Sequence, residues 1–348
     1  MLKKLLLAAA ASLLAVGAAQ ARDQVRAAGS STVFPYAQAA AEEYAKKTGK
    51  KAPVVESLGT GGGFKAFCAG VGENTTDIAT ASRRIKASEF AMCQGNGVKN
   101  ITEVLIGYDG LSIAHSRKDK VEYDLTATDL FKALASEVPQ GGKWVPNPYK
   151  TWNQIKPGLP NMPIRVFGPP PTSGTRDAFV ELVMDVGCEA SGTMDAAKAS
   201  MEKAAYDKLK KEKCGRMRQD GPFVEAGEND NLIVARLDSD PEAFGIFGYS
   251  FLSENADKLK PVAINGVKPS EKTIADFSYP VSRPLYFYVK NDHRKVVPGL
   301  DEFVKVFVSE DSIGANGFNI ERGLTPLEPK ALAKWRDAAE KGFPMKGL

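Results

Sequence analysis

Short apolar stretches typical of strands alternate along this chain with stretches typical of helices. Strands are expected at 54–55, 77–80, 102–106, 111–114, 164–167 and 285–289, and helices at 34–47, 127–135, 176–184, 198–213, 230–236, 300–308 and 329–341. This alternation favours an α/β fold. At 348 residues, with 43% hydrophobic and 25% charged residues, the chain is long enough for two domains.

The first 21 residues have the pattern of a secretory signal peptide. Lys3 and Lys4 precede an uncharged apolar run, and small residues follow up to Ala19-Gln20-Ala21. The apolar run is too short to span a bilayer. We therefore expect export to the periplasm with cleavage after Ala21, which lowers the formal charge from +4 to +2 by removing two lysines. A nearly neutral mature chain argues against nucleic-acid binding.

The chain has four cysteines, and export to an oxidising compartment permits disulfides between them. Three pairings are possible. We prefer Cys68–Cys93 with Cys188–Cys214, because each bond closes a short local loop, and buried free thiols are the alternative. The chain has only two histidines and no Cys-x-x-Cys, so no metal site is expected.

Four loops combine small hydroxyl residues with glycine or arginine, and each follows an expected strand or opens an expected helix. They are Ser30-Ser31-Thr32, Gly59-Thr60-Gly61-Gly62-Gly63, Ser82-Arg83 and Ser173-Gly174-Thr175-Arg176. The first amides of a helix lack intrahelical partners, and the helix dipole favours negative charge there. Glycine allows close approach of a ligand, hydroxyls add donors, and the guanidinium fork suits phosphate oxygens. The four loops together therefore predict a site for an anion.

Each loop alone has an ordinary structural explanation. Ser-Ser-Thr before a helix is a common N-cap, and a glycine run can be a plain turn. Gly61 to Ala66 fits the dinucleotide-binding pattern Gly-x-Gly-x-x-Ala, but Lys86 lies about where that pattern requires an acidic residue. The Walker A pattern fails as well, because Phe64 precedes Lys65 where glycine is needed.

The four motifs in this order resemble the periplasmic phosphate-binding proteins of Pst-type phosphate ABC transporters, over nearly all of the mature chain. The motifs are Gly-Ser-Ser-Thr-Val-Phe-Pro at 29–35, Gly-Thr-Gly-Gly-Gly-Phe-Lys at 59–65, Asp-Ile-Ala-Thr-Ala-Ser-Arg at 77–83 and Gly-Pro-Pro-Pro-Thr-Ser-Gly-Thr-Arg at 168–176. The resemblance is strongest to the branch with Gly-Thr-Gly-Gly-Gly-Phe and Ala-Ser-Arg motifs.

The resemblance implies a type II binding-protein fold, in which two α/β lobes are joined by two crossover strands and the ligand lies in the cleft between them. We expect lobe I at 22–108 and 286–348, and lobe II at 109–285. The resemblance also implies a monomer without cofactor that passes inorganic phosphate to the membrane permease. The phosphate ligands implied are Ser31, Thr32, Val33, Thr60, Gly61, Ser82, Arg83, Ser173, Gly174, Thr175 and Arg176.

One position departs from the best-known branch of that family. An aspartate there follows Ala-Ser and accepts a hydrogen bond from the protonated phosphate, whereas this chain has Arg83. A carboxylate rejects sulfate, while an arginine attracts either anion. Selection for phosphate therefore needs another acceptor, for which Asp109, Glu228 and Asp230 are candidates. Arg83 as a structural ion-pair partner is the alternative.

Three other functions stay open at this stage. The same fold could bind sulfate, tungstate, arsenate or a phosphonate, as Arg83 suggests. A secreted phosphatase would need an activated nucleophile, and neither His115 nor His293 stands in a catalytic motif. An extracellular interaction protein is the third alternative, and it predicts no tight binding of a small anion.

Overall fold

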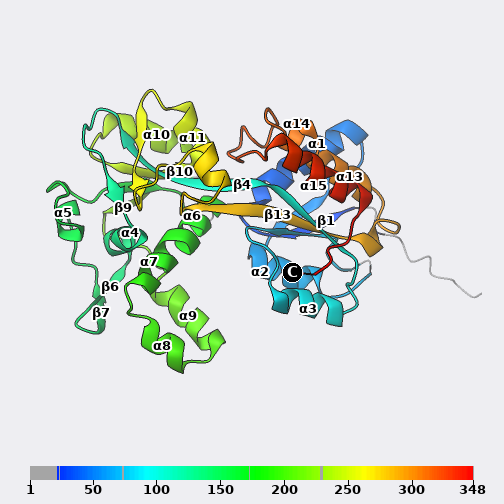
Figure 1. Ribbon diagram of the computed structural model, residues 1–348, viewed down its shortest axis with the longest axis horizontal. Helices are drawn as coiled ribbons and strands as arrows, with labels where there is room; N and C mark the ends of the chain where they lie inside the picture. Colours follow the sequence, from blue (N-terminus) through cyan, green and yellow to red (C-terminus); the bar gives the residue numbers. More distant parts are fainter. Residues whose placement is uncertain (1–21, 23, 73, 172, 228–229, 348) are drawn as a thin grey trace, which may run out of the picture.

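The structure is a computed structural model that describes residues 22–347 except 23, 73, 172, 228 and 229. Two α/β lobes lie side by side in Figure 1. Two long strands, β4 (Ile101–Ser116) and β13 (Ser282–Lys290), run from one lobe into the other. The expected α/β fold with two lobes and two crossover strands is confirmed.

The main sheet passes through both lobes in the strand order β2-β1-β3-β13-β4-β10-β8-β9, with β11 paired to β4. In the first lobe β1 is parallel to β2 and β3, and in the second β8 is parallel to β9 and β10. The strands are β1 (Arg26–Gly29), β2 (Val54–Ser57), β3 (Ile78–Ala81), β8 (Val166–Gly168), β9 (Phe223–Glu225), β10 (Phe244–Gly248) and β11 (Leu259–Pro261). Two small pairs are β5 (Asp124–Leu125) with β12 (Ala263–Ile264), and β6 (Glu137–Gln140) with β7 (Lys143–Pro146).

Helices cover the sheet in both lobes (Figure 1). Those of the first lobe are α1 (Phe34–Thr48), α2 (Gly59–Phe67), α3 (Ala87–Gly95), α13 (Leu300–Phe307), α14 (Glu310–Ile313) and α15 (Pro329–Lys341). Those of the second lobe are α4 (Ala127–Leu134), α5 (Trp152–Ile155), α6 (Gly174–Phe179), α7 (Asp185–Ala190), α8 (Asp195–Ser200), α9 (Lys203–Lys213), α10 (Asp230–Ser239), α11 (Tyr249–Glu254) and α12 (Glu271–Ala275). A π-helical turn at Val180–Met184 joins α6 to α7, and a 3₁₀ turn at Asn291–His293 follows β13.

Each lobe has its own hydrophobic core. Core side chains of the first lobe come from residues 25–106 and 285–339, and those of the second come from residues 111–281. Tyr108, on the crossover strand β4, packs against both. Strand β4 is buried along almost its whole length, as expected for a strand covered on both faces. The lobe boundaries at 108/109 and 285/286 stay a prediction.

Several elements differ from the expectations for a local reason. The glycine run at 59–63 is the first turn of α2 and not a loop, since Gly59 at φ 70° starts a helix that packs against β1 and β3. Segments 102–106 and 111–114 form one strand. The stretch 139–160, for which no helix or strand was expected, contains β7, α5 and the end of β6, and the stretch 198–213 divides between α8 and α9.

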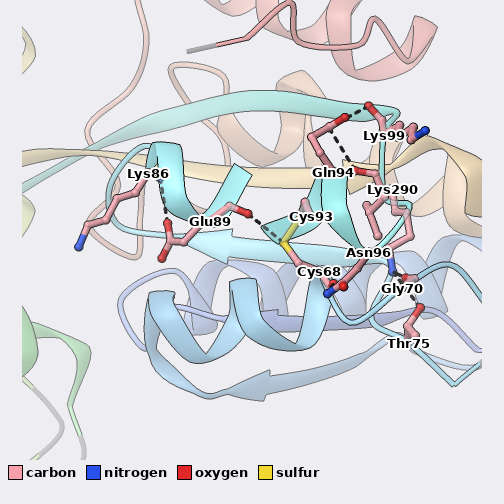
Figure 2. The surroundings of a disulfide bond; sticks show 11 residues. Cys68, Gly70, Thr75, Lys86, Glu89, Cys93, Gln94, Asn96, Lys99 and Lys290 are labelled. Atoms are coloured by element: carbon pink, nitrogen blue, oxygen red, sulfur yellow. Dashed lines mark hydrogen bonds between the residues drawn. A yellow bond between two sulfur atoms is a disulfide. The ribbon is translucent and has the colours of Figure 1, made fainter. Parts of the chain in front are cut away.

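The two preferred disulfides are confirmed. Cys68 at the end of α2 bonds to Cys93 in α3, and Cys188 in α7 bonds to Cys214 after α9. Figure 2 shows the first bond within the first lobe, beside the buried Lys290, whose ammonium donates to Gly70 O (2.6 Å) and Thr75 Oγ1 (2.8 Å). The disulfide therefore ties α2 to α3, and the bonds from Lys290 join the segment after α2 to the end of the crossover strand β13.

The predicted signal peptide and its cleavage site lie outside the described residues. Within the described ranges, no helix has the length and apolar character needed to cross a bilayer. Arg22, the first described residue, pairs with the buried carboxylate of Asp77.

Candidate functional site

The first three polar loops lie at one edge of the first lobe's sheet. Strands β1, β2 and β3 are parallel, so their carboxyl ends meet at this edge. Close packing there depends on glycine. A Cβ on Gly29 would lie 2.0 Å from Thr80 O, and one on Gly63 would lie 2.4 Å from the Gly29 Cα. These contacts bring the start of α2 against the end of β1.

The first loop caps helix α1. Phe34 N donates to Ser30 O at 2.9 Å, and the amide of the buried Val33 lies 3.4 Å from Ser30 Oγ. Val33 N, an expected anion donor, is therefore close to a hydroxyl of its own loop. Thr32 is buried, and Ser31 is half-buried at the surface between the lobes.

The second and third loops meet through their hydroxyl groups. Thr60 Oγ1 and Ser82 Oγ lie 3.0 Å apart, and Ser82 N donates to Thr60 Oγ1 at 3.1 Å. Gly61 is in the first turn of α2 beside Thr60. The expected donors Thr60, Gly61 and Ser82 are thus brought together by the fold.

The fourth loop belongs to the second lobe and contacts the first loop, which belongs to the first lobe. Ser173 caps α6, because its hydroxyl accepts from Thr175 N at 3.2 Å. Thr32 Oγ1 donates to Gly174 O at 3.2 Å, and a Cβ on Gly174 would lie 2.6 Å from Ser31 O. Ser31 Oγ also donates to the carboxylate of Asp177. Only glycine permits this approach at position 174.

A cavity of about 690 Å³ opens beside this contact between the lobes. Five of the lining residues are expected ligands from the first and fourth loops, and Asp109 lies with them. The cavity is lined by Ser31, Thr32, Phe34, Pro35, Tyr36, Asp109, Ser173, Gly174, Thr175, Gly248, Phe251, Glu321, Arg322 and Gly323.

Arg83 is engaged by a carboxylate of its own lobe. Its guanidinium donates twice to Glu89, at 2.7 and 2.8 Å, and lies 5.9 Å from the ring centre of Phe64. Burial alone would raise the pKa of Glu89, but the bonds from Arg83 and from Lys86 N lower it overall. Arg83 therefore forms a structural ion pair with Glu89, as the alternative interpretation expected. Even so, 34% of the Arg83 side chain stays exposed.

Arg176 lies against the second lobe. It donates to Pro169 O at 3.1 Å, lies 4.6 Å from the ring centre of Phe223 and is 3.9 Å from Glu225. Burial lowers the pKa of its guanidinium, which nevertheless keeps its charge because an arginine does not lose its proton in proteins.

Of the three candidate acceptors, Asp109 lies in the cavity wall. It is 6% exposed on β4, and its Oδ2 accepts from Arg283 Nε at 3.1 Å. Its Oδ1 has no hydrogen-bond partner among the residues that the structure describes. Glu228 lies outside the described residues, and Asp230 begins α10.

Arg283 is a residue that sequence reasoning missed. On β13 it lies opposite Asp109, and it also donates to Thr32 Oγ1 and, at 2.7 Å, to Glu181. Being only 5% exposed, it links the crossover strands to both sides of the cleft. The only sequence signal was an arginine next to an apolar strand.

The two histidines have structural surroundings. His115 is enclosed in the core of the second lobe, and His293 Nδ1 lies 2.6 Å from Asp77 in the first. Within the described part of the chain, no cluster of three His, Cys, Asp or Glu side chains could hold a metal. The chemistry that the loops offer is hydrogen-bond donation to an anion.

Comparison with known proteins gives the family. A model described as a PBP superfamily domain matches residues 15–311. The Synechococcus elongatus protein SphX is 33% identical over 331 residues, which cover 93% of this chain and 84% of that protein. The phosphate-binding protein PstS of Staphylococcus saprophyticus is 31% identical over 293 residues, which cover 83% of this chain and 76% of that protein.

Solved structures agree with these matches. The crystal structure of a possible phosphate binding protein from Planctomyces limnophilus has a TM-score of 0.72 and 29% identity, and covers 92% of this chain and 98% of that one. PstS from Borrelia burgdorferi, at 18% identity and a TM-score of 0.56, shares the fold. This chain therefore belongs to the PBP superfamily and, within it, to the PstS-like phosphate-binding proteins.

Proposed function

We propose that this protein is an extracytoplasmic solute-binding protein that captures inorganic phosphate between its lobes and delivers it to an ABC transporter. The observation that carries this proposal is the meeting of the first and fourth loops, at Thr32 and Gly174, beside the cavity between the lobes. An anion held there takes donors from both lobes, so binding favours the state in which the lobes are together. Relatives named as phosphate-binding proteins support phosphate as that anion.

The ligands proposed are the eleven residues expected from the sequence. Thr32, Ser173, Gly174 and Thr175 line the cavity, while Thr60 and Ser82 form the neighbouring hydroxyl pair. Arg83 contributes the face of its guanidinium that Glu89 leaves exposed. The remaining proposed ligands are Ser31, Val33, Gly61 and Arg176.

The cellular setting, the oligomeric state and the lobe bounds expected from the sequence are proposed together with this function. The chain is exported and cleaved after Ala21, and the mature protein is a monomer that docks to a membrane permease. Lobe I consists of 22–108 and 286–348, and lobe II of 109–285. A role in binding rather than catalysis is supported by the relatives, which are named as binding proteins.

Asp109 is the proposed acceptor for the proton of hydrogen phosphate. Arg283 holds Oδ2, and Oδ1 is the oxygen left for a ligand. Sulfate at neutral pH carries no proton, so its oxygens would face an unpaired negative charge. The selecting carboxylate then lies on a crossover strand rather than after Ser82, where Arg83 stands.

Equilibrium dialysis of the mature protein with radiolabelled phosphate tests the proposal. We expect saturable binding at micromolar concentration, displaced by arsenate but not by excess sulfate. Absence of saturable binding would refute the function, and equal displacement by sulfate would refute the selectivity.

Asp109→Asn tests the acceptor. We expect at least tenfold weaker phosphate binding and a smaller preference over sulfate, because the amide brings N–H donors and no negative charge. Glu181→Gln is the matched control, since Glu181 is the other carboxylate bonded to Arg283. If both variants lose affinity equally, Asp109 acts through Arg283 and is not the acceptor.

A further inference from the structure

A second hollow lies between the lobes and abuts the fourth loop, and its charge differs from that of the first cavity. It is lined by Pro171, Asp177 and Arg176 of the fourth loop and the first turn of α6, by side chains of α7 and α9, and by Lys86 of the first lobe. Asp177 bonds to Ser31, so this hollow adjoins the contact between the first and fourth loops. Both hollows thus adjoin the contact between the first and fourth loops.

The charges in this second hollow do not balance. Six cations and four carboxylates line it: Lys86, Arg176, Lys203, Lys210, Lys211 and Arg216, with Asp177, Glu181, Asp185 and Asp207. Three of the carboxylates pair with a cation: Glu181 with Arg283, Asp185 with Lys210 and Asp207 with Lys203. Asp177 accepts from the neutral hydroxyl of Ser31 and keeps its charge, so the cations still outnumber the carboxylates. By contrast, the first cavity is lined by Asp109 and Glu321 against the single cation Arg322.

Three of the six cations have no ion-pair or hydrogen-bond partner for their side chains among the described residues. They are Lys86, Lys211 and Arg216, and all three are exposed. Figure 2 shows Lys86 extending to the side on which the green ribbon of the second lobe lies, whereas Lys99 extends the opposite way. The uncompensated positive charge therefore comes from both lobes.

We propose that this second hollow is the entrance for the anion, and that Lys86, Lys211 and Arg216 speed its capture by electrostatic attraction. Clefts lined by one sign of charge raise association rates and make them dependent on salt. This inference rests on the proposed function, because it concerns how the same anion reaches the same site. It assigns these three side chains to the association step, while the loops hold the bound anion.

The expected size of the effect follows from Coulomb attraction with salt screening. For a doubly charged anion about 10 Å from each cation, the three charges together raise the association rate roughly twentyfold at 10 mM salt and roughly threefold at 0.15 M. Dissociation should change little, since contacts within the loops are untouched.

Stopped-flow mixing with inorganic phosphate measures this rate, using an environment-sensitive dye on a cysteine introduced at the surface. The test variant carries Lys86→Gln, Lys211→Gln and Arg216→Gln. The control carries Lys99→Gln, Lys295→Gln and Lys330→Gln, three exposed lysines outside both hollows, and changes the net charge equally. Lys86→Gln alone provides a second variant with a smaller expected loss.

We expect the test variant to associate roughly twentyfold more slowly at 10 mM salt and to approach the control at high salt. Equal rates for the test and control variants at 10 mM salt, with wild-type affinity, would overturn the entrance while leaving the proposed function intact. Absence of saturable phosphate binding by the unmodified protein would instead overturn the proposed function.

Discussion

His115 should make the protein less stable in mild acid. It is fully buried in the second lobe, with its ring 4.8 Å from that of Tyr123 and near Phe244. Neither ring nitrogen has a hydrogen-bond partner among the residues that the structure describes, although Nδ1 lies 3.3 Å from Asp119. Burial lowers the pKa of His115 from 6.5 to about 4, against the opposing attraction of Asp119.

The size of this effect follows from the two pKa values. The unfolded chain binds a proton at His115 near pH 6.5, whereas the folded protein resists protonation down to about pH 4. Unfolding therefore takes up a proton in this window, and stability falls as the pH falls through it. The full difference corresponds to about 3.4 kcal/mol. About 2 kcal/mol of it should be lost between pH 7 and pH 5.

Urea unfolding of the mature protein, followed by circular dichroism from pH 7 to pH 5, measures the loss. We expect His115→Leu to reduce the fall in unfolding free energy by about 2 kcal/mol. The comparison between variants matters because burial also raises the pKa of Asp185 to about 6, which changes stability in the opposite direction. Phe247→Leu, a buried substitution without a titrating group, is the control and should shift the curve equally at each pH. If the wild-type and His115→Leu curves are parallel, the ring of His115 is not held neutral.

Two further predictions concern the contact between the lobes and a disulfide. Gly174→Ala should weaken phosphate binding at least tenfold in isothermal titration, because the added carbon would lie 2.6 Å from Ser31 O. Gly95→Ala, whose Cβ meets no atom within 4 Å, should bind normally, and equal affinities would contradict the close approach. Replacing both Cys188 and Cys214 by serine opens a loop with a sequence separation of 26 and should lower the unfolding free energy by about 3 kcal/mol. An unchanged urea midpoint would show that the bond is not a stabilising constraint.

The parts of this structure that follow from local sequence were predictable. Proline in the first turn and glycine after the last turn are local signals for the ends of a helix. In the structure α1 begins at Phe34, has Pro35 in its first turn and is followed by Gly49. The two disulfides were predictable for the same reason, because each joins cysteines 25 or 26 residues apart. The glycines at 59–63 predicted a loop, which was wrong, because their helical conformation depends on packing of α2 against β1.

The parts that depend on contacts between distant segments were not predictable from one sequence. Arg83 and Glu89 lie six residues apart, but their pairing requires the turn into α3. Arg283 meets Asp109 and Thr32 across separations of 174 and 251 residues, and nothing near position 283 indicates either contact. Asp109 could be named as a candidate acceptor, but only the pairing of β4 with β13 places it in the cavity wall.

The contacts of Arg283 bear on how the two lobes come together. Its three partners are Asp109 on the crossover strand β4, Thr32 in the first loop and Glu181 at the π-helical turn of the second lobe. The first and fourth loops also touch directly, through Thr32 and Gly174. Protein contacts therefore supply part of the free energy that holds the lobes together. A bound anion can shift the balance further only through bonds that it makes in the closed state and not in an open one. By this reasoning, donors that both lobes aim at the anion control closure, while donors of a single lobe contribute affinity alone.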